Sequence, residues 1–307
     1  MAARQRPDHA PGSPPASGGR DFHDLRETGE RAGVGLLIGR GFGTARDTLA
    51  RGLLRLGATP NHITFVGFLM TAAAGFCLAR GAGQQVPYFY AGHGPVGWWP
   101  LAAGVFLLLS AACDMLDGAV ARLGNCATTF GALLDSTLDR LSDMAIYVGC
   151  AVYFALAGNL TYQLLSLIAL CAAVMTSYVK ARAENVIDDC SVGYWLRGER
   201  YVGILVGCFA GHMPALLWQQ SLTVALTVYR RVDYARRVLA SKTKGTPPPR
   251  RWPRRTWRSW LRPWRHPRGS IPHDLISGFN IAYIILAARF WPALLATGPF
   301  ADPLMGR

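Results

Sequence analysis

The fold and the chemistry of this chain are decided by residues 114–139, which read DMLDGAVARLGNCATTFGALLDSTLD. Four acidic side chains stand in this stretch: Asp114, Asp117, Asp135 and Asp139. They lie where one apolar segment ends and the next begins. Carboxylates at the edge of a membrane are costly unless they are paired or hold a ligand. The stretch therefore indicates a functional site.

The spacing of these residues indicates how they come together. Positions three and four apart on a helix share one face. The first segment contributes a stripe and its neighbours, namely Asp114, Asp117, Gly118, Ala121 and Arg122. The second contributes Gly131, Asp135 and Asp139. If the two helices pack antiparallel, the four carboxylates converge, and such oxygen ligands suit Mg²⁺ or Mn²⁺ and not zinc.

A buried salt-bridge network is the alternative explanation of the aspartates. Arg122 and Arg140 are the nearby cations, and they neutralise at most two of the four negative charges. An unpaired buried carboxylate is costly or becomes protonated. The mismatch in charge favours a metal site.

The composition indicates an integral membrane protein. Hydrophobic residues make up 51% of the 307 positions, whereas charged residues make up 16%. Six apolar segments are candidates for spans: 62–80, 96–121, 132–157, 161–184, 200–212 and 214–238. We expect an all-α integral membrane protein with six core transmembrane helices. A further apolar stretch at 276–297, interrupted by Arg289, predicts a possible extra C-terminal helix.

Loop charges predict the orientation of these spans. The connections 81–95, 158–161 and 211–219 contain no Lys or Arg. The other side carries many basic residues, among them Arg51, Arg55, Arg122, Lys180, Arg182, Arg197, Arg200, Arg230, Arg231, Arg236 and Arg237. The N-terminus and the aspartates are therefore expected on the cytoplasmic side of the cell (inner) membrane.

The chain divides into five predicted regions. Residues 1–30 are expected to be disordered, and 31–57 to form an amphipathic helix in the cytoplasmic interface. Residues 58–240 form the transmembrane domain. Residues 241–273 are a linker with ten Lys and Arg, four Trp and no acid, which suits lipid headgroups, single-stranded nucleic acid or no ligand. Attachment to a bilayer favours lipid over nucleic acid. Residues 274–307 are an apolar C-terminal segment.

The aspartate run resembles the signature of the CDP-alcohol phosphotransferase family, membrane enzymes of phospholipid synthesis. Eight fixed positions over 26 residues match, and the resemblance extends over residues 55–240. It implies an enzyme that transfers a phosphatidyl group from CDP-diacylglycerol to an acceptor alcohol with release of CMP. It also implies two divalent cations per active site, Mg²⁺ or Mn²⁺, and a homodimer.

The resemblance also implies roles for individual residues. The metal ligands are Asp114, Asp117, Asp135 and Asp139, and Asp139 is in addition the general base that takes the acceptor's proton. The CDP-lipid is expected to contact Gly118, Ala121, Arg122, Gly131, Asn61 and Thr64. For Asn61 and Thr64, an ordinary helix start after Pro60 is an equally good explanation.

Basic residues further along the chain predict the acceptor. Lys180 and Arg200 stand twenty residues apart, which resembles the branch of the family that makes phosphatidylinositol phosphate from inositol 1-phosphate. Arg231 is a candidate third member of a pocket for the acceptor's phosphate, because a phosphorylated acceptor needs a cationic site of its own. The alternative is that these residues only follow the positive-inside rule.

Other functions are compatible with parts of the pattern. The same chemistry could use another acceptor: glycerol 3-phosphate, a different polyol phosphate, serine or an ether-lipid alcohol. A cation transporter would carry its acids near the middle of the bilayer on broken helices, whereas these aspartates gather at the cytoplasmic edge. A non-catalytic membrane scaffold would have no need of four aspartates.

Overall fold

A computed structural model describes residues 34–89, 95–247, 271–290, 302 and 304. It divides into two units, residues 1–45 and 46–307. In the first unit the described residues, 34–45, are helical and belong to α2 (Val34–Arg55). All that follows concerns the second unit. The predictions for residues 1–30, for 248–270 of the basic linker and for 291–297 lie outside the described residues.

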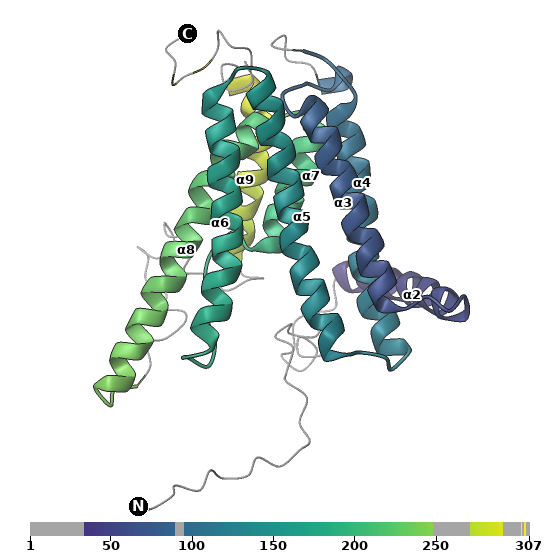
Figure 1. The fold of residues 1–307 in the computed structure, drawn as a ribbon, viewed down its shortest axis with the longest axis vertical. Helices are drawn as coiled ribbons and strands as arrows, with labels where there is room; N and C mark the ends of the chain where they lie inside the picture. Colours follow the sequence, from purple (N-terminus) through teal and green to yellow (C-terminus); the bar gives the residue numbers. More distant parts are fainter. Residues whose placement is uncertain (1–33, 90–94, 248–270, 291–301, 303, 305–307) are drawn as a thin grey trace, which may run out of the picture. The chain divides into compact units, whose positions relative to one another are not determined.

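The second unit is built of helices (Figure 1). After α2 come α3 (Pro60–Gly81), a short 3-10 helix (Pro87–Phe89), α4 (Trp99–Leu123), α5 (Thr129–Leu156), α6 (Leu160–Glu184), α7 (Arg197–Ala210), α8 (Met213–Thr243) and α9 (Ile271–Phe290). Among the described residues there is no strand, only one isolated bridge between Gln85 and Val96. The prediction of an all-α protein is confirmed.

The six segments predicted as spans correspond to α3–α8. Three of these helices, α3, α4 and α6, are long and apolar enough to cross a membrane. In contrast, α5 carries several charged side chains and α7 has only 14 residues. The count of six spans therefore stays a prediction, as does the interfacial position of α2. The predicted extra C-terminal helix is present as α9 and begins at Ile271.

Polar caps determine where the helices that carry the site begin. The Thr59 side chain accepts a hydrogen bond from the His62 N–H at the start of α3, where Pro60 fits the first turn. The Thr128 hydroxyl accepts from the Gly131 N–H at 2.9 Å at the start of α5. Such caps provide acceptors for amides of the first helical turn, which have no partner within the regular helix. These starts orient the faces of α3 and α5 that carry polar residues.

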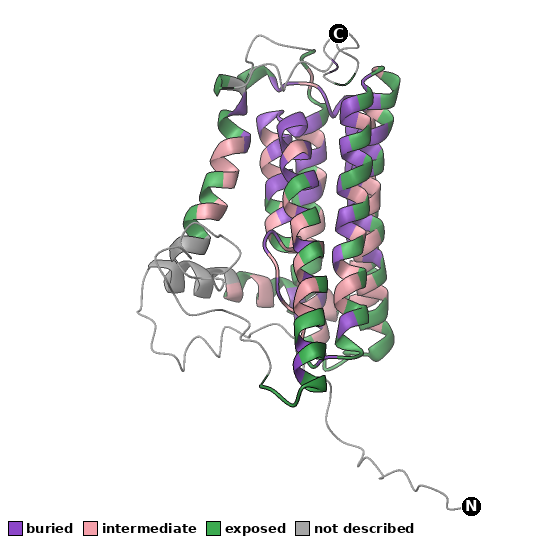
Figure 2. Ribbon diagram, turned by 90° about the vertical axis from the view of Figure 1, so that its left-hand side faces the viewer, coloured by how far each residue is buried: buried purple, intermediate pink, exposed green. Residues whose placement is uncertain are grey.

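Packing brings α3, α4 and α5 together. Helix α3 contacts both α4 and α5, and α6 contacts α5 and α8. At the crossing of α3 and α5 the backbones touch, because a Cβ at Gly75 would collide with the Ala145 carbonyl and one at Gly149 with the Gly75 carbonyl. Buried side chains from α3 to α9 form one apolar core that includes Leu107 and Ile204. Figure 2 shows these buried residues concentrated in the upper part of the bundle.

Candidate active site

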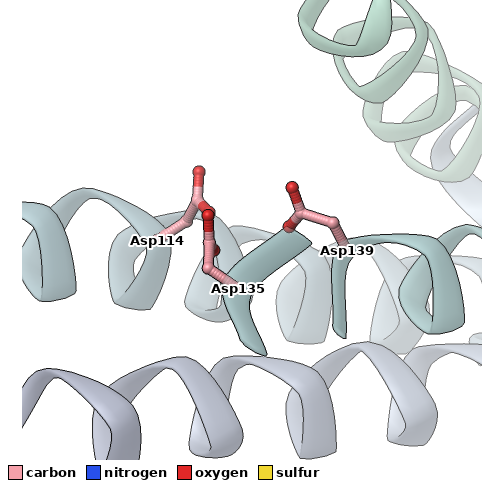
Figure 3. Close-up of side chains that lie close together, drawn as sticks. All are labelled: Asp114, Asp135 and Asp139. Atoms are coloured by element: carbon pink, nitrogen blue, oxygen red, sulfur yellow. The ribbon is translucent and has the colours of Figure 1, made fainter. Parts of the chain in front are cut away.

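Three carboxylates from two helices converge on one point. Asp114 comes from α4, and Asp135 and Asp139 come from α5. One oxygen of each lies within 4.8 Å of the other two. Figure 3 shows the three groups directed to the same side of their helices. Asp114 is exposed and the other two are half-buried, so the cluster is open to a ligand.

The fourth aspartate is held apart from this group. Asp117 is buried, and its Oδ2 accepts a hydrogen bond of 2.7 Å from the Thr64 hydroxyl of α3. Thr64 also donates to the Pro60 carbonyl at 3.0 Å. The geometry therefore gives Thr64 a definite role, because it ties Asp117 to the start of α3.

A cavity of about 220 Å³ lies beside the carboxylates. Its lining combines acids, hydroxyls and one arginine with small residues: Thr64, Gly67, Phe68, Ser110, Ala111, Asp114, Asp117, Leu138, Asp139, Ser142, Arg197, Gly198 and Tyr201. The walls come from α3, α4, α5 and α7. A polar ligand in this cavity would meet two different signs of charge within one site.

Arg197 supplies the positive charge. It is the first residue of α7, and its Nη2 lies 2.5 Å from Asp139 Oδ1. Sequence reasoning treated Arg197 only as one of many basic loop residues and missed it as a site residue. Its place in the site depends on how the loop before α7 folds, and the sequence carries no periodic signal for that. Of the two cations weighed above as partners of the acids, Arg140 donates instead to the Ser136 carbonyl, and Arg122 is exposed.

The small residues expected to face the nucleotide differ in their surroundings. A Cβ built on Gly118 would have only the Arg122 Nη1 within 4 Å, at 3.6 Å, so the helix surface here is open. A Cβ on Gly131 would lie 3.0 Å from Thr128 Oγ1 and 3.1 Å from Asn61 Oδ1. Gly131 therefore lets the starts of α3 and α5 approach each other, and this brings Asn61 close to α5. Ala121 is half-buried near the end of α4.

The three residues predicted to hold the acceptor's phosphate gather around the end of α6. Arg200 donates from Nη1 to the Thr176 hydroxyl at 3.3 Å, and Arg231 donates to the Thr176 carbonyl. Lys180 lies one helical turn further along and contacts Glu184 at 3.8 Å. Both arginines are buried. The structure thus brings two arginines from α7 and α8 to the same residue of α6.

A fifth aspartate pairs with one of these arginines. Arg200 Nη2 lies 2.7 Å from Asp143 Oδ2, and both side chains are buried. Asp143 was not considered as a site residue. A signal for it was present, because it follows Asp139 by four residues on the same face of α5. The pair links α5 to α7, one helical turn after Asp139 on α5.

The donor set fits a divalent cation. The three converging carboxylates carry more negative charge than Arg197, the ion-pair partner of Asp139, offsets. Carboxylate oxygens are the ligands that Mg²⁺ and Mn²⁺ prefer, whereas zinc sites favour nitrogen and sulfur donors. The residues present are thus the ones that such an ion requires.

Comparison with known proteins identifies the family. Residues 58–247 match the model of the CDP-alcohol phosphatidyltransferases. An archaetidylinositol phosphate synthase of Methanothermobacter thermautotrophicus is 39% identical over 160 residues, which cover 52% of this chain and 70% of the relative. A phosphatidylinositol phosphate synthase of Mycobacteroides abscessus is 32% identical over 210 residues, which cover 66% of this chain and 88% of the relative.

A solved structure agrees with these relatives. The crystal structure of Mycobacterium tuberculosis phosphatidylinositol phosphate synthase with CDP-DAG bound is similar with a TM-score of 0.51 and 27% identity. The match covers 62% of this chain and 92% of that one. The same enzyme in complex with manganese and citrate also matches with a TM-score of 0.51. Because the family model covers more than half of the chain and includes the whole aspartate run, the chain belongs to the CDP-alcohol phosphatidyltransferase family and is an enzyme of that class.

Proposed function

We propose that this enzyme transfers the phosphatidyl group of CDP-diacylglycerol to inositol 1-phosphate, giving phosphatidylinositol phosphate and CMP. The observation that carries the proposal is the convergence of Asp114, Asp135 and Asp139 beside a cavity that also contains Arg197. Acidic, metal-binding side chains beside an arginine suit a reaction between a pyrophosphate and a phosphorylated alcohol. The names of the relatives support this acceptor.

In this proposal the aspartates hold the metal ions. Asp114, Asp117, Asp135 and Asp139 are the ligands of two divalent cations, Mg²⁺ or Mn²⁺. When bound, such cations offset the negative charge of a pyrophosphate and of the displacement at its phosphorus. The Thr64 hydroxyl orients Asp117 by donating to its Oδ2. The carboxylates reach this position from α4 and α5, which both pack against α3, and such a preorganised arrangement keeps the cost of reorganisation low.

Asp139 has a second role as general base. It accepts the proton of the acceptor hydroxyl while that oxygen attacks the β-phosphorus of CDP-diacylglycerol. The bond from this phosphorus to the bridging oxygen breaks, and CMP leaves with that oxygen. A carboxylate is a weak base for an alcohol, so the acceptor must be held close to the reacting phosphorus. The position of Asp139 in the wall of the cavity supports this role.

The CDP moiety lies against the start of α3, the end of α4 and the start of α5. The open surface at Gly118 lets the nucleotide approach the helix backbone. Arg122, exposed one turn further on, pairs with a phosphate of the CDP group. The contacts with Ala121, Gly131, Asn61 and Thr64 complete this side of the site.

The acceptor's phosphate binds on the opposite side, among Lys180, Arg200 and Arg231. Buried Nε atoms on two arginines support this. The Nε atoms of Arg200 and Arg197 are buried and have no hydrogen-bond partner among the described residues. An unsatisfied buried donor is costly, and a phosphate oxygen would satisfy it. Lys180 is partly exposed and adds a mobile positive charge.

The same proposal includes the setting of the enzyme. Six helices, α3–α8, cross the cell (inner) membrane, with the N-terminus and the aspartates facing the cytoplasm. This orientation puts the site where a nucleotide-linked substrate is available, and the loop charges support it. The functional unit is a homodimer. These statements rest on the sequence and on membership of the family.

Release of CMP and formation of the lipid product test the proposal together. Purified protein is supplied with CDP-diacylglycerol, Mg²⁺ and one acceptor at a time, with Asp139→Asn as the inactive control. We expect turnover with inositol 1-phosphate, and none with glycerol 3-phosphate, serine or free inositol. Turnover with one of those acceptors instead would keep the roles of the aspartates and refute the acceptor pocket. No CMP with any acceptor, from protein that binds CDP-diacylglycerol, would refute the reaction itself.

A further inference from the structure

Helix α9 lies outside the part of the chain that matches the family, residues 58–247. It nevertheless packs against α7 and α8 (Figure 1). The side chain of Asn280, on α9, forms hydrogen bonds with two other parts of the chain. Its Oδ1 accepts a hydrogen bond from Gln219 Nε2 of α8 at 2.7 Å, and its Nδ2 donates to the Tyr194 hydroxyl at 2.6 Å. Asn280 therefore connects α8 to the loop that precedes α7.

The loop that Asn280 contacts holds an uncommon backbone conformation. Trp195 has a φ of 60°, in the left-handed region that bulky side chains rarely adopt. Such a conformation persists only where the surroundings fix it. Here they do so on several sides. Trp195 is 1% exposed and packs with Ala172 of α6 and Val224 of α8, and Ile276 of α9 packs against the same cluster.

Hydrogen bonds complete the fixation of this loop. The Tyr194 N–H donates to the Thr227 hydroxyl at 3.2 Å, and the hydroxyl donates to the Tyr194 carbonyl. The Tyr194 side chain is buried, and its hydroxyl ends at Asn280. Removing the contact with Asn280 would leave a buried hydroxyl without this partner. The position of Tyr194 is thus set from both α8 and α9.

This loop leads directly into the site. Three residues after Tyr194, Arg197 begins α7, and its guanidinium contacts Asp139 at 2.5 Å. Helix α9 is therefore connected to Asp139 in three steps: the hydrogen bond from Asn280 to Tyr194, the turn at Trp195, and the ion pair between Arg197 and Asp139.

We propose that α9 positions Arg197. Through the hydrogen bond between Asn280 and Tyr194, it holds the guanidinium of Arg197 against Asp139 and so sets how readily Asp139 accepts a divalent cation. Asn280 and Tyr194 are positioning residues, since they touch neither the cavity nor the carboxylates. The inference rests on the proposed function in one respect only, namely that Asp139 is a metal ligand.

The direction of the effect follows from competition for one oxygen. A cation that binds Asp139 must displace Arg197 from Oδ1 or share that oxygen with it. Weakening the ion pair therefore strengthens metal binding. The pair is partly exposed, with 38% of the Arg197 side chain and 25% of the Asp139 side chain accessible. Exposed pairs of this kind are weak, so removing Arg197 should tighten binding by about fivefold at most.

Binding of Mn²⁺ alone to the full chain tests the inference. Free Mn²⁺ is measured by electron paramagnetic resonance during titration of the purified, detergent-solubilised protein. We expect Arg197→Gln to tighten binding about fivefold and Tyr194→Phe or Asn280→Leu about two- to threefold. In the Arg197→Gln background, Tyr194→Phe should add nothing, because the two changes act through one contact. Phe279→Leu is the matched control, an exposed neighbour of Asn280 on α9, and should leave binding unchanged.

The outcomes separate the inference from the proposed function. Tyr194→Phe removes one oxygen atom, so it keeps the test valid even if Asn280→Leu fails to fold. Normal Mn²⁺ binding that Tyr194→Phe leaves unchanged, or changes equally in the Arg197→Gln background, would overturn the inference alone. No Mn²⁺ binding to the unaltered protein would overturn both. The titration involves no acceptor and no CDP-lipid, so an error in the proposed substrate would not affect its result.

Discussion

The buried ion pair between Asp143 and Arg200 should be a main determinant of stability. The side chains of Asp143 and Arg200 are 8% and 3% exposed, and Oδ2 and Nη2 are 2.7 Å apart. Asp143→Ala would leave the Arg200 guanidinium buried with a single hydroxyl contact, that of Thr176 at 3.3 Å. Removing one partner of a buried pair typically costs about 3–5 kcal/mol, because the remaining charge is uncompensated.

Thermal unfolding measures this cost. One kcal/mol shifts the midpoint by about 2–4 °C in domains of 150–250 residues. Asp143→Ala should therefore lower the midpoint of thermal unfolding by roughly 6–20 °C. Unfolding is monitored by tryptophan fluorescence of the purified protein in detergent. Replacing both partners by apolar residues, Asp143→Leu with Arg200→Met, should recover most of the loss, because no buried charge remains.

An exposed pair provides the control. Asp233 on α8 contacts Arg236 at 3.0 Å and Arg237 at 2.8 Å near the protein surface. Exposed pairs within one helix contribute about 0.3–0.5 kcal/mol each, so Asp233→Ala, which removes both, should cost about 1 kcal/mol at most and lower the midpoint by no more than about 4 °C. If Asp143→Ala has an effect as small as that, or if the apolar double variant is less stable than the single one, the reasoning about the buried pair is wrong.

Three further predictions concern Thr64, Gly118 and the metal requirement. Thr64→Val removes the 2.7 Å hydrogen bond to Asp117 and should lower kcat/KM for CDP-diacylglycerol about tenfold or more, whereas Thr64→Ser should restore it. Gly118→Ala should not lower thermal stability, since its Cβ would meet only Arg122 Nη1 at 3.6 Å and alanine favours the helix, yet it should reduce CMP release by obstructing the nucleotide. Unchanged CMP release in Gly118→Ala would contradict the assignment of that surface to the nucleotide. Chelation with EDTA should abolish CMP release, and Mg²⁺ or Mn²⁺ should restore it; full activity in EDTA would exclude a metal requirement.

The spacing of the aspartates predicts that all four converge if α4 and α5 pack against each other, whereas in the structure the main packing partner of both helices is α3. Three of the four carboxylates do converge, each with one oxygen within 4.8 Å of the other two. The sequence could not predict that Asp117 turns toward Thr64 instead. Helical periodicity determines the face on which a residue lies, but the partner of its side chain depends on the neighbouring helix. Thr64, near the start of α3, is the residue that could indicate this contact, but an ordinary helix start explains its presence equally well.

The basic half of the site was harder to predict. Their positions in the sequence predict Lys180, Arg200 and Arg231 as the site for the acceptor's phosphate. The structure gathers these residues around α6. It also pairs Arg200 with Asp143, which the sequence pattern does not predict. Arg197 was not chosen, because its approach to Asp139 depends on the turn at Trp195. That turn is stabilised by contacts with α6, α8 and α9, which are distant in sequence. Local sequence patterns do not predict contacts between segments that are distant in sequence.

The most direct test of the account is to locate Mn²⁺ in crystals of the full chain grown with CDP-diacylglycerol, by anomalous scattering. The account predicts two Mn²⁺ peaks among Asp114, Asp117, Asp135 and Asp139, with the pyrophosphate of the lipid beside them. The same crystals of Asp139→Asn should lose at least one peak. Bound CDP-diacylglycerol with no Mn²⁺ at these carboxylates would contradict the central claim that the aspartate cluster is the metal centre of phosphatidyl transfer.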